Sequence, residues 1–267
     1  MCLIAFALDC HRRYRLVLAA NRDEYFRRPT APAAFWEEAS QLLAGRDLEA
    51  GGTWLGITTS GRIAAVTNYR ERQEVGKVLP SRGRLVADFL SGNETRDEFR
   101  QVLEQEGRRY GGFNLIFGDA SGLSYWSNRG AATTHIPPGV HGLSNHRLDT
   151  PWPKVAAARD GLARLLRHDA TLETEELLAL LAFPEQFSDD LLPDTGVGLA
   201  LERLLSPLFI SYGDYGTRSS TVILIDWENR VTFHERSFDH LQHITGDVLF
   251  QIGSVGTVPG DGKGPRE

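Results

Sequence analysis

An α+β fold is predicted, with largely antiparallel sheets covered by segregated helices. Three observations lead to it. The expected elements run in the order strands, helices, strands, helices, strands, without the regular strand–helix alternation that builds a parallel sheet. No segment repeats at a fixed period, and no internal segment has the composition of a linker. The 267 residues, 41% of them hydrophobic, suffice for a sizeable core. We therefore expect a single domain over residues 1–252.

Each element follows from apolar runs, hydrophobic periodicity and turn residues. The expected strands span residues 2–8, 14–20, 52–58, 61–69, 112–118, 123–127, 131–135, 140–145, 209–212, 219–226 and 230–236. Two helices are expected in the middle of the chain, one capped by Ser81 and ending near Gly92, the other capped by Thr95. Further helices are expected over 152–168, 172–181 and 199–205. Residues 253–267 hold five Gly and two Pro, which predicts a disordered tail.

Charge and hydropathy exclude some classes of partner. The chain carries 29 Lys and Arg against 35 Asp and Glu, a formal net charge of −6. Nucleic acids and anionic membranes attract basic surfaces, so neither is expected as the main partner. No apolar run approaches the roughly 18 residues that a membrane helix needs, and no secretory leader is recognisable at the first residues. We expect a cytoplasmic protein without membrane insertion.

The cysteine and methionine counts direct attention to the first residues. Only two cysteines occur, Cys2 and Cys10, too few for a disulfide scaffold or a zinc site with paired CxxC motifs. The eight histidines show no metal-ligand spacing, so no metal site is expected, although a histidine could still serve as an axial haem ligand. The single methionine is the initiator, and the small Cys2 permits its removal. The mature chain would then begin with a cysteine.

An N-terminal cysteine combines a nucleophile with a base. The thiolate of Cys2 can attack a carbonyl, and its own α-amine, which titrates near roughly 8, can accept the proton. No histidine partner is then required. The alternative is that Cys2 is a small apolar residue opening a buried strand, a common position for cysteine.

Polar segments interrupt the apolar strands at four places. The run Asn21-Arg22-Asp23-Glu24 comes where the second strand is expected to end, close to Cys2 on the paired strand. Such a cluster suits positioning of a substrate carbonyl and of the α-amine, whereas the alternative is a turn with solvated charges. Each of the other three segments, 67–70, 142–146 and 215–220, contains an amide or a guanidinium. These groups could stabilise an oxyanion, a carboxylate or the thiolate. The alternative is that the amides stabilise turns and the guanidinium forms an ordinary ion pair.

Taken together, these segments resemble the NRDE family, whose eukaryotic members are called transport and Golgi organisation protein 2. The resemblance runs in order from residue 1 to about 226. It rests on MCLI at 1–4, ANRDE at 20–24, GGTWLG at 51–56, TNYR at 67–70, SRG at 81–83, GFNL at 112–115, GLSN at 142–145, LDTPWPKV at 148–155 and YGTRSST at 215–221.

The family is similar to N-terminal nucleophile hydrolases, and this similarity implies a four-layer αββα sandwich. It further implies that Cys2 is the nucleophile, Asn145 an oxyanion donor and Arg218 an arginine near the thiol, with Asn68 lining the site. Related acylases show Arg, two residues, then Asp on the second strand. Here the run is Asn21-Arg22-Asp23-Glu24, so Glu24 would take the place of the Asp and Asn21 that of the Arg.

Two functions are compatible with this resemblance. The first is a cysteine amidohydrolase that acts on a small amide or thioester through Cys2 and needs no cofactor. The second is a non-catalytic protein that uses the same pocket to bind and traffic haem or a lipid such as an acyl-CoA. The four residues 21–24 and Asn68 would contact the substrate or ligand in either case.

Overall fold

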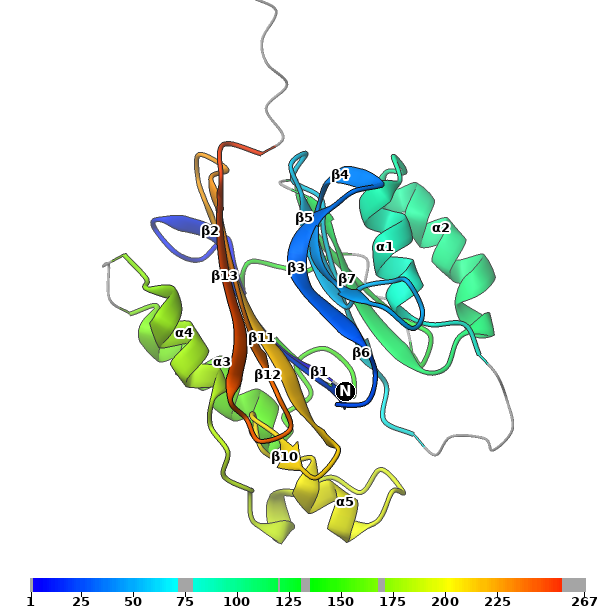
Figure 1. Cartoon of the computed structure of the whole chain (residues 1–267), viewed down its shortest axis with the longest axis vertical. Helices are drawn as coiled ribbons and strands as arrows, with labels where there is room; N and C mark the ends of the chain where they lie inside the picture. Colours follow the sequence, from blue (N-terminus) through cyan, green and yellow to red (C-terminus); the bar gives the residue numbers. More distant parts are fainter. Residues whose placement is uncertain (1, 72–78, 120, 131–134, 168–170, 256–267) are drawn as a thin grey trace, which may run out of the picture.

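The computed structural model describes residues 2–71, 79–119, 121–130, 135–167 and 171–255. Two sheets pack face to face, and helices cover the outer side of each (Figure 1). The first sheet has the strand order β13-β12-β11-β2-β1-β9, with β10 paired to β11, and the second has the order β3-β4-β5-β6-β7-β8. Helices α3 and α4 cover the first sheet, and α1 and α2 the second. The four-layer αββα architecture is therefore confirmed.

All the strand pairs in the described residues are antiparallel, as expected. The first sheet consists of β1 (Cys2–Leu8), β2 (Tyr14–Tyr25), β9 (Gly139–Leu143), β10 (Ser211–Tyr212), β11 (Tyr215–Asp226), β12 (Val231–Phe238) and β13 (Ile244–Ile252). The second consists of β3 (Thr30–Trp36), β4 (Ala39–Asp47), β5 (Leu55–Thr58), β6 (Ile63–Asn68), β7 (Phe113–Asp119) and β8 (Gly122–Ser127). The α-helices are α1 (Gly83–Ser91), α2 (Arg96–Glu106), α3 (Pro153–Leu165), α4 (Thr174–Leu181) and α5 (Leu199–Leu204).

Strand alternation divides the core into three parts. Alternate residues of β1, such as Ile4 and Phe6, point between the two sheets, and the residues between them, such as Leu3 and Ala5, point toward α3 and α4. A third cluster, which includes Phe89 of α1, lies between the second sheet and its helices. Because β1 and β2 are buried on both faces, their sequences read as continuous apolar runs.

The structure adds three strands that the sequence did not predict. Strands β3 and β4 follow Pro29, and the pairing between them has two register irregularities, so no regular alternation marks them. Strand β13 lies at the edge of the first sheet and contains Gly246 and Asp247, which are unfavourable in strands. At the other extreme, the strand expected over 209–212 is only the two-residue β10.

Helix caps and the chain end show further differences. Thr95 caps α2, as predicted, and the structure adds a complete capping box with Glu98. Helix α1 starts after Arg82, so the prediction of Ser81 as its cap is wrong. The strand expected over 131–135 falls almost entirely outside the described residues. The predicted tail does so from residue 256, whereas Val255 is buried between the sheets and its N–H donates to the carbonyl of Asn229 at 2.9 Å. No helix in the described ranges has the length and hydrophobicity to cross a membrane.

Candidate active site

The polar run of β2 lies within the strand and not in a turn after it. Strand β2 continues to Tyr25, and Asn21, Arg22 and Asp23 are all buried, so the alternative of a turn with solvated charges is wrong. The register between β1 and β2 places Cys2 directly opposite Arg22. Both residues lie on the face of the sheet that meets the second sheet, because Ile4 and Ala20 on that face belong to the core between the sheets.

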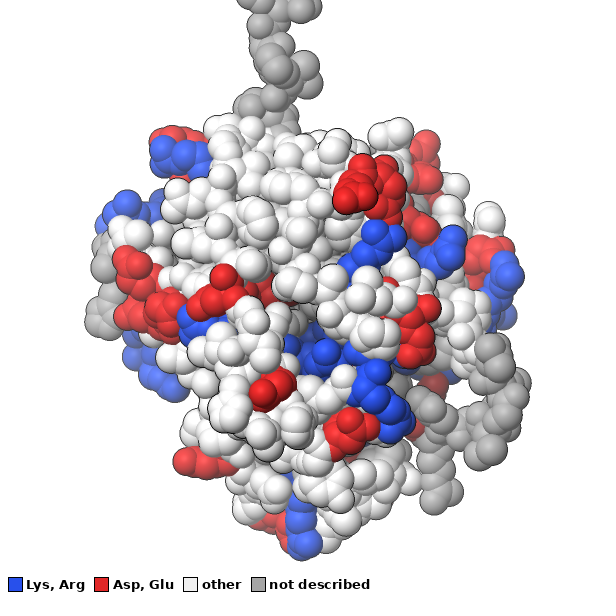
Figure 2. Space-filling model, viewed as in Figure 1, with Lys and Arg blue, Asp and Glu red and all other residues white. Residues whose placement is uncertain are grey.

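A cleft of about 660 Å³ opens at this end of the sheet interface. Ten of its lining residues are charged, namely Arg22, Asp23, Glu24, Arg28, Asp47, Glu49, Glu71, Arg82, Arg108 and Arg129. Its other walls include Cys2, Trp54, Asn68 and Tyr69. In Figure 2, Lys and Arg side chains gather in a hollow near the middle of the visible face, where Figure 1 shows the gap between the two sheets. Among the predicted site residues, the structure thus brings together Cys2, Arg22, Asp23, Glu24 and Asn68.

The surroundings of Cys2 act on its thiol in opposite directions. Burial raises the pKa of the thiol, and the nearby Asp23 carboxylate raises it further. The guanidinium of Arg22 and the backbone N–H of Asp23 lower it. The backbone of Cys2 is also fixed, since its carbonyl accepts a hydrogen bond of 3.0 Å from Ser144 Oγ. The backbone that carries the thiol is therefore fixed at the cleft wall, and Arg22 is one of the cations near the thiol.

Asp23 of β2 and Lys154 of α3 are buried charged residues that influence each other electrostatically and also act on Cys2. Asp23 Oδ1 accepts a hydrogen bond of 2.8 Å from Thr217 Oγ1. Burial raises the pKa of Asp23, while the charge of Lys154 lowers it. Lys154 is fully buried, donates to the carbonyl of Leu205 at 3.0 Å, and has its pKa lowered by burial to about 8. Sequence reasoning missed Lys154, although it lies in the conspicuous segment 148–155.

Two guanidinium groups line the cleft near Cys2. Arg22 lies over the ring of Trp54, 4.2 Å from its centroid, and Nη1 donates to Thr30 Oγ1 at 3.1 Å. Arg82 donates from Nη1 to the carbonyl of Gly112 at 3.1 Å. Burial lowers the pKa of both side chains. Arg82 was also missed as a site residue, and the signal for it is the segment SRG at 81–83.

Asn145 and Asn68 have different positions. Asn145 is fully buried and does not line the cleft. Its Nδ2 donates to the backbone carbonyl of Asn68 at 2.9 Å, and its Oδ1 accepts from Arg70 Nη2 at 3.4 Å. Arg70 in turn forms a buried ion pair with Glu202. The side chain of Asn145 thus holds the end of β6, and Asn68 is the amide on the cleft wall.

Asn21 and Arg218 lie outside the cleft. Asn21 Nδ2 donates to the carbonyls of Leu181 and Leu208 at 3.0 and 2.7 Å, on the helix side of the sheet. Arg218 Nη1 donates to the carbonyls of Tyr25 and Arg28, both at 2.9 Å. A guanidinium that holds these carbonyls stabilises the connection between β2 and β3, and it is not placed beside the thiol.

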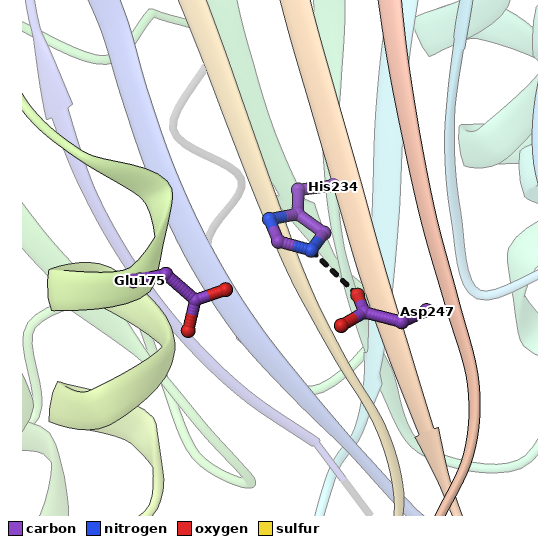
Figure 3. Close-up of side chains that lie close together, drawn as sticks. All are labelled: Glu175, His234 and Asp247. Carbon is purple, nitrogen blue, oxygen red and sulfur yellow. Dashed lines mark hydrogen bonds and ion pairs between the residues drawn. The ribbon is translucent and has the colours of Figure 1, made fainter.

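A separate cluster on the first sheet has the composition of a metal site. Glu175 from α4 faces His234 and Asp247 from the adjacent strands β12 and β13 (Figure 3), and their ligand atoms lie within 4.8 Å of one another. Arg236 already bridges the two carboxylates, with Nη2 at 2.7 Å from an oxygen of each. The guanidinium supplies the positive charge that a metal ion would bring, so the cluster forms an ion-pair network.

Comparison with known proteins agrees with the segments described above. The profile of a family described as Transport and Golgi organisation 2 matches residues 1–240. The chain belongs to this family. The Transport and Golgi organization protein 2 homolog of Bos taurus is 37% identical over 257 residues, covering 89% of this chain and 93% of the relative. The Homo sapiens homolog is 36% identical with the same coverage, and the Drosophila melanogaster protein is 30% identical over 277 residues.

Solved structures with similarity to this family member include two hydrolases. A Caenorhabditis elegans N-acylethanolamine-hydrolyzing acid amidase ortholog has a TM-score of 0.49 and 9% identity, covering 83% of this chain and 92% of its own. The C2A mutant of the conjugated bile acid hydrolase from Clostridium perfringens has a TM-score of 0.44 and 8% identity, covering 94% and 92%. The layer order given above comes from the strand pairing of this chain itself.

Proposed function

We propose that this member of the Transport and Golgi organisation 2 family is a cysteine amidohydrolase acting on a small polar amide or thioester. The observation that carries the proposal is the position of Cys2. Its thiol lies on the wall of the 660 Å³ cleft, opposite Arg22, at the start of the strand that removal of Met1 would leave with a free α-amine. A nucleophile, a base and a cleft then coincide at one residue.

The proposed reaction proceeds through an acyl-enzyme. The α-amine takes the proton of the Cys2 thiol, and the sulfur attacks the substrate carbonyl. The carbon–nitrogen or carbon–sulfur bond breaks, and the leaving amine or thiol departs with the proton. Water, activated by the same α-amine, then attacks the thioester and releases the acid and the free thiol.

The described side chains have separable roles in this scheme. Asp23, buried behind Cys2 and influenced by the charge of Lys154, would hold the α-ammonium that forms during attack. Asn68 on the cleft wall is the amide that we assign to the oxyanion, in place of the Asn145 side chain, which instead fixes the Asn68 carbonyl. Arg22 favours the thiolate of Cys2.

The second candidate, a carrier of haem or lipid, has less support. Haem and acyl chains bind in clefts lined mainly by apolar side chains, with a few polar groups for orientation. Ten charged residues line this cleft, and no described histidine does. Among the described lining residues, Cys2, Tyr69 and Tyr110 are the side chains that could ligate haem iron. A haem complex ligated through Cys2 would lose its Soret shift in the Cys2→Ala variant.

The test uses purified protein and p-nitrophenyl acetate as the acyl probe. Intact mass spectrometry first determines whether Met1 has been removed. We expect complete removal, an acetyl adduct on Cys2 that hydroxylamine strips, and a burst of p-nitrophenol. The variant Cys2→Ala should lose both burst and turnover.

Cys10 provides the matched control, because it is an exposed cysteine in the same chain. The Cys10→Ala variant should keep the burst, the adduct and the turnover. Full retention of Met1 would refute the proposal, since the nitrogen of Cys2 would then be an amide and could not act as base. Turnover that survives in Cys2→Ala would refute it equally.

A further inference from the structure

Four of the five arginines that line the cleft fall into two groups. Arg28 forms two hydrogen bonds with the Asp47 carboxylate, at 3.1 and 2.7 Å, and Arg129 forms two with Glu71, at 2.7 and 2.8 Å. These two guanidinium groups are neutralised. Within the described ranges, Arg22 and Arg82 have no carboxylate within 4.0 Å of their guanidinium nitrogens.

The partners of Arg22 and Arg82 leave most of their donors unused. A guanidinium has five N–H groups, and each of these two has a hydrogen bond through a single nitrogen to a neutral oxygen, Thr30 Oγ1 or the Gly112 carbonyl. Arg22 is buried and Arg82 partly so. Desolvated cations without a counterion are costly, and an anion supplied by a ligand would remove the cost.

The acidic groups nearby do not occupy this position. Glu24 influences both arginines but is not within ion-pair distance of either, and its Oε1 accepts the N–H of Tyr25 at 2.9 Å. Asp23 is directed to Thr217 on β11. Arg108, also on the cleft lining, is exposed, so water can solvate it. Among the described residues of the cleft lining, Arg22 and Arg82 are thus the partly desolvated cations that share the cleft with the Cys2 thiol and have no carboxylate partner.

We propose that Arg22 and Arg82 form an anion subsite beside Cys2 that receives a carboxylate or a phosphate carried by the substrate. The inference rests on the proposed function, because the anionic ligand is a substrate only if the protein is a hydrolase. It narrows the substrate class to amides or thioesters with an anionic group close to the scissile bond. The planar fork of arginine matches the two oxygens of either anion. The guanidinium of Arg22 lies over the ring of Trp54, and this contact restricts the movement of the side chain.

The test compares two alkylating reagents that differ in charge. Iodoacetate is an anion and iodoacetamide is neutral; with both, the thiolate sulfur bonds to the methylene carbon and iodide leaves. We expect the ratio of the iodoacetate rate to the iodoacetamide rate to be about tenfold higher at Cys2 than at Cys10, because a positive cleft concentrates anions. Peptide mass spectrometry gives both rates in one sample. Turnover is not needed, so failure of the hydrolase proposal would leave this result unaffected.

Variants separate the subsite from the overall charge. Arg82→Gln should bring the Cys2 ratio toward that of Cys10, while Arg82→Lys should keep most of it. Arg230→Gln makes the same change in net charge at the opposite end of the first sheet, where Asp226 pairs with Arg230. This variant should leave the ratio of the two rates at Cys2 unchanged. Protection of Cys2 by acetate identifies a carboxylate ligand, and protection by inorganic phosphate a phosphate ligand.

A second measurement applies if neither reagent modifies Cys2. At constant ionic strength, phosphate or acetate should raise the melting temperature of the unaltered protein relative to chloride, and Arg82→Gln should abolish the rise. Equal rate ratios at Cys2 and Cys10, an unchanged ratio in Arg82→Gln, or melting temperatures that neither anion raises would overturn the proposal.

Discussion

Asn21 and Arg22 are consecutive residues of β2 that lie on opposite faces of one sheet and differ in how far their hydrogen-bonding capacity is used. Asn21, on the helix side, donates hydrogen bonds to two carbonyls, and its Oδ1 accepts a hydrogen bond of 2.6 Å from Ser220 Oγ. Arg22, on the cleft side, makes one hydrogen bond and one ring contact. The comparison shows that neighbouring residues of one polar motif can differ: one uses its hydrogen-bonding groups to stabilise the fold, and the other leaves most of its donors unused.

The largest expected effect is on the Asn21 side of the comparison. Asn21→Leu would leave the carbonyls of Leu181 and Leu208 buried without their donor. We expect a loss of roughly 3 kcal/mol in the free energy of unfolding, since each unsatisfied buried group costs about 1–3 kcal/mol. Urea denaturation measures it. Alkylation of Cys2 under native conditions should not change, because Asn21 does not line the cleft. An unfolding midpoint equal to that of the unaltered protein would show that the hydrogen bonds of Asn21 do not stabilise the fold.

Arg22→Gln should reduce the free energy of unfolding less than Asn21→Leu does, but it should change the pKa of the Cys2 thiol more. The lost contacts are one ring contact and one hydrogen bond, together roughly 1–2 kcal/mol. Because the guanidinium lowers the pKa of the Cys2 thiol, its removal should move that pKa upward. The pH dependence of alkylation by iodoacetamide measures this shift, with Cys10 in the same sample as the reference. A pH midpoint that stays in place would show that Arg22 does not act on the thiol.

The order of the elements could be predicted from sequence, because buried strands and amphipathic helices leave direct signals. The hairpin of β1 and β2 is confirmed, and so is Thr95 as the N-cap of α2. Strands β3 and β4 were missed, since Pro29 and the irregular register hide the alternation of side chains. Such strands are defined by their partners, and a single sequence does not show partners.

The site was predictable as a set of segments but not residue by residue. The neighbourhood of Cys2 and Arg22 follows from the hairpin and is confirmed by the register. The places of Asn145 and Arg218 are decided by backbone carbonyls of Asn68, Tyr25 and Arg28, whose positions depend on the tertiary structure. Lys154 was missed because a lysine next to an apolar helix face ordinarily reaches solvent.

His234 and Glu235 of β12 are, like Asn21 and Arg22, consecutive residues that lie on opposite faces of the first sheet. His234 bonds to Asp247 at 2.6 Å on the helix side. Glu235 is buried between the sheets, where its Oε1 accepts the N–H of Ala33 at 2.7 Å and its Oε2 accepts from Thr221 Oγ1 at 3.1 Å. Burial raises the pKa of Glu235 from 4.5 to about 7, and the charge of Arg22 opposes the rise. The cleft side of the sheet interface should therefore respond to pH near neutrality.

The smallest expected effect concerns this response. Since the pKa of Glu235 is higher in the folded chain than in the unfolded one, its proton stabilises the fold fully below about pH 4.5, and this contribution is lost as the pH rises through 7. Between pH 7 and pH 6 the gain in the free energy of unfolding is about 1 kcal/mol.

Glu235→Gln should remove that difference, measured as the change in unfolding free energy between the two pH values. Glu175→Gln, on the helix side next to His234, should retain it, because the pKa of Glu175 is lowered by Arg236 and the carboxylate stays ionised at both pH values. Equal pH responses of Glu235→Gln and the unaltered protein would show that Glu235 does not exchange its proton on unfolding in this range, and the helix and cleft sides would then differ in hydrogen bonding alone.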